Sequence, residues 1–114
     1  MTFAESEIKE LSQLCTEVEV LTEGTLTFIL LRGLQFQHKR ELIKIDALIC
    51  PQKHDGYPTR IFLDRKLEID GTANWKVYQF LGSNWHSWSW NNIPKEQRLI
   101  QILADHLSPL MSQV

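Results

Sequence analysis

The spacing of apolar residues predicts a helix at each end of the chain. Near the N-terminus, Thr2 and Glu5 have the spacing of a capping box, so we expect a helix from about Phe3 to about Thr16. Its apolar face would hold Ala4, Ile8, Leu11, Leu14 and Cys15. Near the C-terminus, the same spacing links Leu99, Leu103, His106, Leu107 and Leu110. We expect that second helix to begin after Asn92, an N-cap residue type, and to end or kink at Pro109.

Between the helices, four stretches have the composition of β-strands: residues 25–34, 42–50, 59–63 and 75–81. In the second stretch, Ile43, Ile45, Ala47 and Ile49 form an apolar face, which places Cys50 on the other, partly exposed side. Residues 17–22 fit either a short strand or an extended lead-in, and Gly33 marks either a bulge or the end of its strand.

Short connections favour antiparallel pairing of strands that follow one another. The helices must bury their apolar faces, and one face of the sheet is available to them. The sequence therefore predicts an α+β two-layer domain over residues 1–114, with an N-terminal helix, a four-stranded antiparallel meander and a C-terminal helix.

All four tryptophans lie between residues 75 and 90. We expect Trp75 and Trp85 in the core, because large rings dominate small cores. Trp88 and Trp90 are one residue apart, so in an extended segment they point the same way. They would cover the core or form a patch for a partner.

Composition narrows the functional classes. A net charge of −2 gives no electrostatic basis for binding nucleic acid or an anionic membrane. The apolar runs are too short to span a bilayer, and the acidic N-terminus lacks the features of a signal peptide, so we expect a cytoplasmic protein. Its two cysteines would then remain thiols. The sequence has no Gly-x-Ser-x-Gly elbow and no glycine-rich phosphate loop.

Candidate chemistry centres on Cys50, His86 and His106, which are residue types that bind zinc. His86 lies between Trp85 and Trp88, and His106 lies on an apolar helix face, so the fold would have to bring the three together. The alternatives are a buried thiol and buried histidines with hydrogen-bond partners. His54 and His38 are expected in solvated turns.

The order of elements resembles the ubiquitin-conjugating enzyme fold. The resemblance rests on Tyr57-Pro58 before the third strand and on Trp88-Ser89-Trp90 followed by a helix. The sequence departs from that family because no cysteine follows Tyr57-Pro58 and no His-Pro-Asn motif is present. The resemblance thus implies a relative without the catalytic cysteine.

The chain also resembles small bacterial proteins associated with ubiquitin-like conjugation, which are expected to bind metal through Cys, Glu, His and His. Cys50, Glu68, His86 and His106 occur here in that order. The resemblance implies a zinc site at these four residues and a protein partner from a ubiquitin-like conjugation system.

The resulting hypothesis is a small cytoplasmic accessory or adaptor domain that carries a metal site and is not itself an enzyme. The alternatives are a metal-dependent enzyme that activates water at an open metal position, and a purely structural interaction module.

Overall fold

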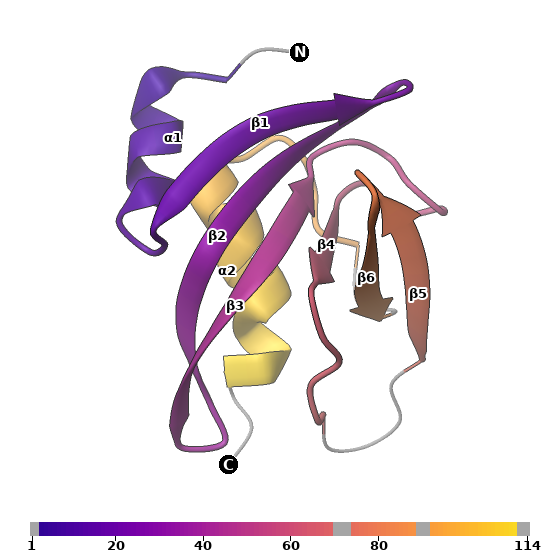
Figure 1. The fold of residues 1–114 in the computed structure, drawn as a ribbon. Helices are drawn as coiled ribbons and strands as arrows, with labels where there is room; N and C mark the ends of the chain where they lie inside the picture. The colour runs from indigo at the N-terminus through magenta and orange to yellow at the C-terminus, as the bar shows by residue number, and fades with distance from the viewer. Residues whose placement is uncertain (1–2, 70–73, 89–91, 112–114) are drawn as a thin grey trace.

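The computed structural model describes residues 3–69, 74–88 and 92–111. They form one antiparallel sheet of six strands with two helices (Figure 1). The elements are α1 (Glu5–Ser12), β1 (Glu17–Glu23), β2 (Leu26–His38), β3 (Glu41–Cys50), β4 (Arg60–Leu63), β5 (Trp75–Phe80), β6 (Ser83–Trp88) and α2 (Leu99–Met111). The strand order is β1-β2-β3-β4-β6-β5.

The predicted four-stranded meander of the ubiquitin-conjugating type is wrong. Residues 17–23 are a full strand, because β1 pairs with β2 from Glu17↔Arg32 to Glu23↔Leu26. The aromatic stretch also contains a turn that the prediction missed. Leu81 and Gly82 both have positive φ, at 54° and 77°, which is the geometry of a tight hairpin turn. The chain therefore folds back after β5, and β6 takes the place beside β4.

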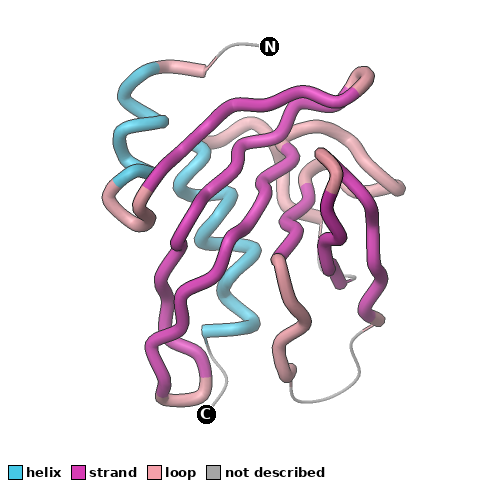
Figure 2. Tube along the Cα trace, viewed as in Figure 1, coloured by secondary structure: helices cyan, strands magenta, loops and turns pink. Residues whose placement is uncertain are grey.

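Both helices pack on the same face of the sheet, as predicted (Figures 1 and 2). We call this the helix face. Leu11 of α1 and Ile102 of α2 are completely buried there. The strands contribute alternate residues: Ile29, Leu31, Leu34, Phe36, Ile45, Ala47, Ile49, Ile61, Leu63 and Trp88. The apolar face predicted for residues 42–50 is thus confirmed at Ile45, Ala47 and Ile49.

The opposite face of the sheet carries a second core, which we call the aromatic face. Its buried residues are Phe28, Leu30, Leu48, Cys50, Phe62 and Trp85, and Tyr78 and Phe80 pack against them. The β1–β2 and β5–β6 turns meet over this face, where the Leu81 amide donates to Glu23 Oε1 at 3.1 Å. The end of β3 is therefore covered on both sides, and Cys50 is 0% exposed instead of partly exposed.

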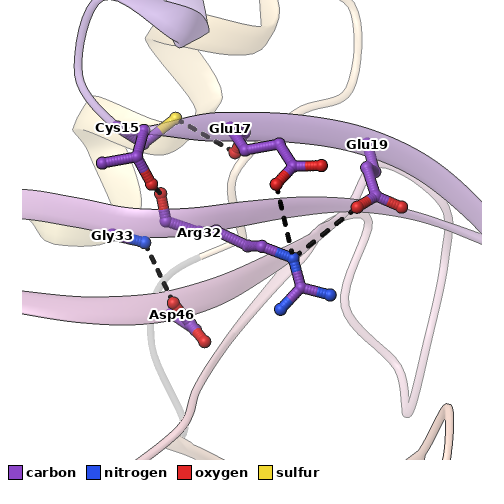
Figure 3. Close-up of polar contacts among 7 residues, drawn as sticks. Cys15, Glu17, Glu19, Arg32, Gly33 and Asp46 are labelled. Carbon is purple, nitrogen blue, oxygen red and sulfur yellow. Dashed lines mark hydrogen bonds and ion pairs between the residues drawn. The ribbon is translucent and has the colours of Figure 1, made fainter.

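A β-bulge interrupts β2 at Gly33, one of the two alternatives that the sequence left open. Leu31 pairs with Ala47 and Leu34 pairs with Ile45, so one residue of β2 is extra. Gly33 has φ +66° and donates its amide to Asp46 Oδ1 at 2.9 Å (Figure 3). A Cβ at this position would lie 2.8 Å from Thr16 Oγ1, so both the conformation and the space favour glycine.

The helix ends differ from the prediction. Helix α1 begins at Glu5 with Ala4 as its N-cap residue, and the predicted cap Thr2 lies outside the described residues. Helix α2 begins at Leu99, several residues later than the Asn92 cap implied, and Pro109 lies inside it instead of ending it. In the last turns of a helix, a proline removes only one hydrogen bond, and packing can offset that loss.

Candidate functional site

The four predicted metal ligands lie on different parts of the molecule. Cys50 is on the aromatic face, whereas His106 is buried on the helix face. His86 is half-buried in β6, between Leu63 of β4 and Val77 of β5. The Glu68 side chain is 84% exposed and lies 3.3 Å from Lys39 Nζ.

The sheet itself separates Cys50 from His106. Within residues 3–69, 74–88 and 92–111, no group of three or more His, Cys, Asp or Glu side chains is placed to share a metal ion. A zinc site needs about four such ligands in tetrahedral contact with one ion. The metal site therefore stays a prediction from the sequence, without support from the arrangement of these side chains.

His106 has a structural partner. Its Nε2 lies 2.8 Å from the Thr59 hydroxyl, and that hydroxyl donates to the Ile93 carbonyl at 2.8 Å. Burial, and then the positive charge of Arg60, lower the pKa of His106 to about 4. The imidazole is thus a neutral donor that joins α2 to the segment before β4, which matches the alternative of a buried, bonded histidine.

An apolar groove lies between helix α2, the segment that follows α1, and the β2–β3 hairpin. Its volume is about 320 Å³, and it is lined by Leu14, Leu34, Gln35, Phe36, Gln37, Leu42, Ile100, Leu103, Ala104, Leu107 and Met111. The five most exposed large apolar side chains among the described residues include Leu14, Leu42 and Met111, at 39%, 62% and 50% exposure. Scattered apolar side chains are normal on a surface, but three around one groove are typical of a binding site.

The groove is built by contacts on each side of it. The Leu14 carbonyl accepts a hydrogen bond from the Gln35 amide at 3.2 Å, which fixes the end of α1 against β2. His38 Nδ1 lies 3.0 Å from the Leu110 carbonyl, which ties the tip of the hairpin to α2. His38 is therefore buried, at 8% exposure, and the prediction of a solvated turn residue is wrong.

A buried cation occupies one end of the aromatic face. Arg60 is 4% exposed, and its guanidinium carbon lies 4.8 Å from the Tyr57 ring centroid and 5.5 Å from that of Tyr78. Its Nη2 donates to Ser87 Oγ at 2.9 Å. Rings and a hydroxyl thus hold the guanidinium in place, in the geometry of cation–π packing.

The turn at residues 54–57 brings further polar groups to Arg60. Asp55 and Gly56 have φ of +50° and +86°, and the amide and carbonyl of His54 pair with those of Tyr57. His54 packs against the rings of Phe62 and Tyr78, with centroids 5.6 Å and 5.4 Å away. Burial, and then the charge of Arg60, lower the pKa of His54, which is not the solvated loop residue that the sequence indicated.

Polar residues gather at the other end of the aromatic face, around Arg32. Its Nε lies 3.6 Å from Glu19 Oε1 and 3.9 Å from Glu17 Oε2 (Figure 3). A depression of about 230 Å³ there is lined by Arg32, Asp46, Asp64 and Asn84 over a floor that includes Leu30 and Trp85. Asp64 accepts the Asp46 amide at 3.1 Å, so backbone groups already engage these carboxylates. We assign this end a structural role.

Sequence reasoning missed the groove and Arg60. Leu14 was assigned to the apolar face of the first helix and Leu42 to the more polar side of its strand, and only the fold places them beside Met111. For Arg60, the one available signal was a charged residue next to the apolar run Ile61-Phe62-Leu63. Of the two tryptophans expected in the core, Trp85 is buried and Trp75 packs on Trp88 with centroids 5.0 Å apart. Trp90 lies outside the described residues.

No protein-family model, curated protein or solved structure matches this chain. The described helices are all too short or too polar to cross a membrane.

Proposed function

We propose that this protein is an accessory or adaptor domain that binds the apolar face of an amphipathic helix from a partner protein in the groove. The observation that carries the proposal is the collection of exposed Leu14, Leu42 and Met111 around one apolar depression. Removing such side chains from water contributes about 25 cal/mol for each Å² of apolar surface, from which the entropic cost of association is subtracted.

The lining of the groove defines the chemistry of the occupant. Among the described residues that line it, none is ionisable, and the polar side chains are those of Gln35 and Gln37. A charged ligand would lose its hydration without gaining an opposite charge. The occupant must therefore present apolar side chains to the floor made by Leu34, Phe36 and Leu103.

The backbone around the groove favours a helix over an added strand. On the edge of β2 that β3 does not cover, the Gln35 amide is already bonded to the Leu14 carbonyl. A strand that adds to a sheet needs free backbone groups, whereas a helix satisfies its own and binds through side chains at i, i+3, i+4 and i+7. A volume of about 320 Å³ suits a few such anchors.

The partner class comes from the sequence resemblance, which points to a component of a ubiquitin-like conjugation system. The Cys50 thiol is completely buried on the other side of the sheet, so it is not placed to act as the nucleophile of such a system. A binding role is therefore the part of the hypothesis that the surface supports.

The test is an NMR titration of the ¹⁵N-labelled protein with a synthetic leucine–lysine peptide whose leucines repeat at helical spacing. We expect shifts to concentrate at the residues that line the groove, and Leu42→Lys to abolish them. Val77→Lys is the matched control, because Val77 is 59% exposed and Leu42 is 62% exposed. A purified ubiquitin-like modifier, titrated in the same way, tests the partner class.

Two results would overturn the proposal. One is a set of shifts centred away from the groove. The other is equal peptide affinity for Leu42→Lys and Val77→Lys. A modifier that binds elsewhere while the peptide binds the groove would reject only the partner class.

A further inference from the structure

The Arg60 guanidinium is held in a fixed orientation before any ligand arrives. Its Nη2 donates to Ser87 Oγ at 2.9 Å, and Ser87 in turn donates to the Ile61 carbonyl at 2.7 Å. The rings of Tyr57, Phe62 and Tyr78 lie within 4.8–5.6 Å of the guanidinium carbon. An arginine fixed in this way loses little side-chain entropy when it binds a further group.

The other end of the guanidinium is left incomplete. Arg60 Nη1 is buried, has no hydrogen-bond partner among the described residues, and lies 3.7 Å from Asp55 Oδ2. A hydrogen-bonded guanidinium–carboxylate pair is typically about 2.7–2.9 Å between heavy atoms. His54 Nδ1 is a second buried nitrogen in the same cluster without a partner. Buried donors without partners are costly, so this end is suited to receive an acceptor.

Within the part of the chain that the structure describes, Asp55 is the one acidic side chain paired with Arg60, and it is half-exposed. Its carboxylate accepts from the Tyr78 hydroxyl at 2.8 Å and lies 4.0 Å from Lys76 Nζ, yet the side chain is 48% exposed. The three cationic or donor groups project from β4 and β5, whereas Asp55 is carried by the turn at residues 54–57. The donors thus belong to the sheet, and the acceptor belongs to a connecting turn.

We propose that Arg60, Tyr78 and Lys76 form a binding site for an external carboxylate, and that Asp55 occupies this site when no ligand is bound. An untethered carboxylate can place one oxygen on the Tyr78 hydroxyl and the other on Arg60 Nη1, which Asp55 does not reach. The exposed carboxylate of Asp55 would then turn out to solvent.

The surroundings define the class of ligand. Tyr57 and Tyr78 are half-buried rings beside the guanidinium, so a flat apolar group next to the carboxylate would gain contact with them. The shared chemistry is a carboxylate on an aromatic or apolar carrier. A free aromatic acid and the C-terminus of a peptide that ends in phenylalanine both have it, and the experiment separates these two sources.

The experiment compares the affinity of the whole protein and its variants for sodium benzoate, followed by the side-chain NMR signal of Arg60. We expect Asp55→Ala to bind benzoate about tenfold more tightly than the wild type, because removal of the internal competitor frees one charge-assisted hydrogen bond. Asp55→Asn keeps the shape of the turn and removes only the charge, so it should also bind more tightly. Glu68→Ala, which removes an exposed acid elsewhere, should bind as the wild type does.

A second substitution tests the geometry. Adding Tyr78→Phe to Asp55→Ala should weaken benzoate binding again, because the ring stays and only the hydroxyl is lost. In parallel, tight binding of a phenylalanine-terminated peptide but not of its C-terminal amide would identify a peptide as the preferred source. Benzoate affinities of Asp55→Ala and Asp55→Asn no higher than that of Glu68→Ala would overturn the proposal, as would an Arg60 signal that does not shift.

Discussion

Thr59 and His106 form a buried hydrogen bond of 2.8 Å between the segment before β4 and helix α2. Because the Thr59 hydroxyl donates to the Ile93 carbonyl, it accepts from His106, so the neutral imidazole carries its proton on Nε2. Protonation would place a positive charge on a buried ring near the Arg60 guanidinium, and both burial and that charge oppose it.

Acid should therefore destabilise the fold through His106. The pKa of His106 is 6.5 in the unfolded chain and about 4 in the folded protein. Unfolding at a pH between these values therefore takes up a proton. The contribution of His106 to the free energy of unfolding is fully present above pH 6.5 and is lost as the pH drops toward 4. The loss from this group is on the order of 3 kcal/mol. Urea denaturation from pH 7 to pH 4 measures the effect.

The control for this prediction is His106→Gln, which keeps a donor for Thr59 but cannot take up a proton. Its stability should fall less steeply with decreasing pH than that of the wild type. Equal slopes for the two proteins would show that His106 does not control the acid sensitivity.

Gly33→Ala should destabilise the protein more than Gly24→Ala. Both glycines have positive φ, at +66° and +61°, so each alanine is strained to a similar degree. Only Gly33 also has Thr16 Oγ1 at 2.8 Å and Lys44 Cε at 2.9 Å from the added Cβ, whereas Gly24 has open space. Overpacking of this kind costs about 1–3 kcal/mol. Thermal or urea denaturation of both variants tests the difference, which should vanish if the bulge can widen freely.

The two thiols should react at very different rates. Cys50 is 0% exposed, and burial raises the pKa of its thiol. Burial also raises the pKa of Cys15, but this residue is only half-buried, with its Sγ 3.3 Å from the Leu11 carbonyl. In a thiol-labelling assay, the native protein should show one faster thiol, which Cys15→Ser removes. Labelling of Cys50 without unfolding would contradict the placement of β3 under the aromatic face.

Removal of metal should leave the protein unchanged. Because Cys50 and His106 lie on opposite faces of the sheet, we expect a protein purified without an affinity tag to keep its unfolding midpoint after dialysis against a chelator. His86→Ala should likewise not alter the metal content. Near-stoichiometric zinc that is lost in His86→Ala would restore the metal hypothesis and would require a different arrangement of these residues.

Elements with a clear local signal could be predicted from the sequence. The apolar spacing of Leu11 and of Leu99, Leu103 and Leu107 indicated two helices that pack on one face, and the structure confirms it. The strand at residues 42–50 was equally clear, because its alternate residues differ strongly in polarity. Gly33 was recognised as a candidate bulge because glycine inside a strand is otherwise unfavourable.

Features that depend on long-range contacts could not be predicted. The turn at Leu81-Gly82 lacks the Asn-Gly or Asp-Gly pair that usually indicates a two-residue hairpin, so β6 was missed. His38 looks solvated beside two basic residues, and only the position of Leu110 explains its burial. Likewise, no local pattern shows that residue 50 and residue 106 end on opposite sides of a sheet.

The extra residue in β2 has a consequence for the phase of the whole strand. Before Gly33, the odd-numbered residues Ile29 and Leu31 face the helices, and after it the even-numbered Leu34 and Phe36 do. The bulge at Gly33 thus changes which alternate residues of β2 face the helices in the second half of the strand. If these same residues formed a regular strand without the bulge, Gln35 and Gln37 would turn inward, or the pairing with β3 would slip by one residue. The floor of the groove and the reach of His38 to α2 therefore both depend on the bulged conformation at Gly33.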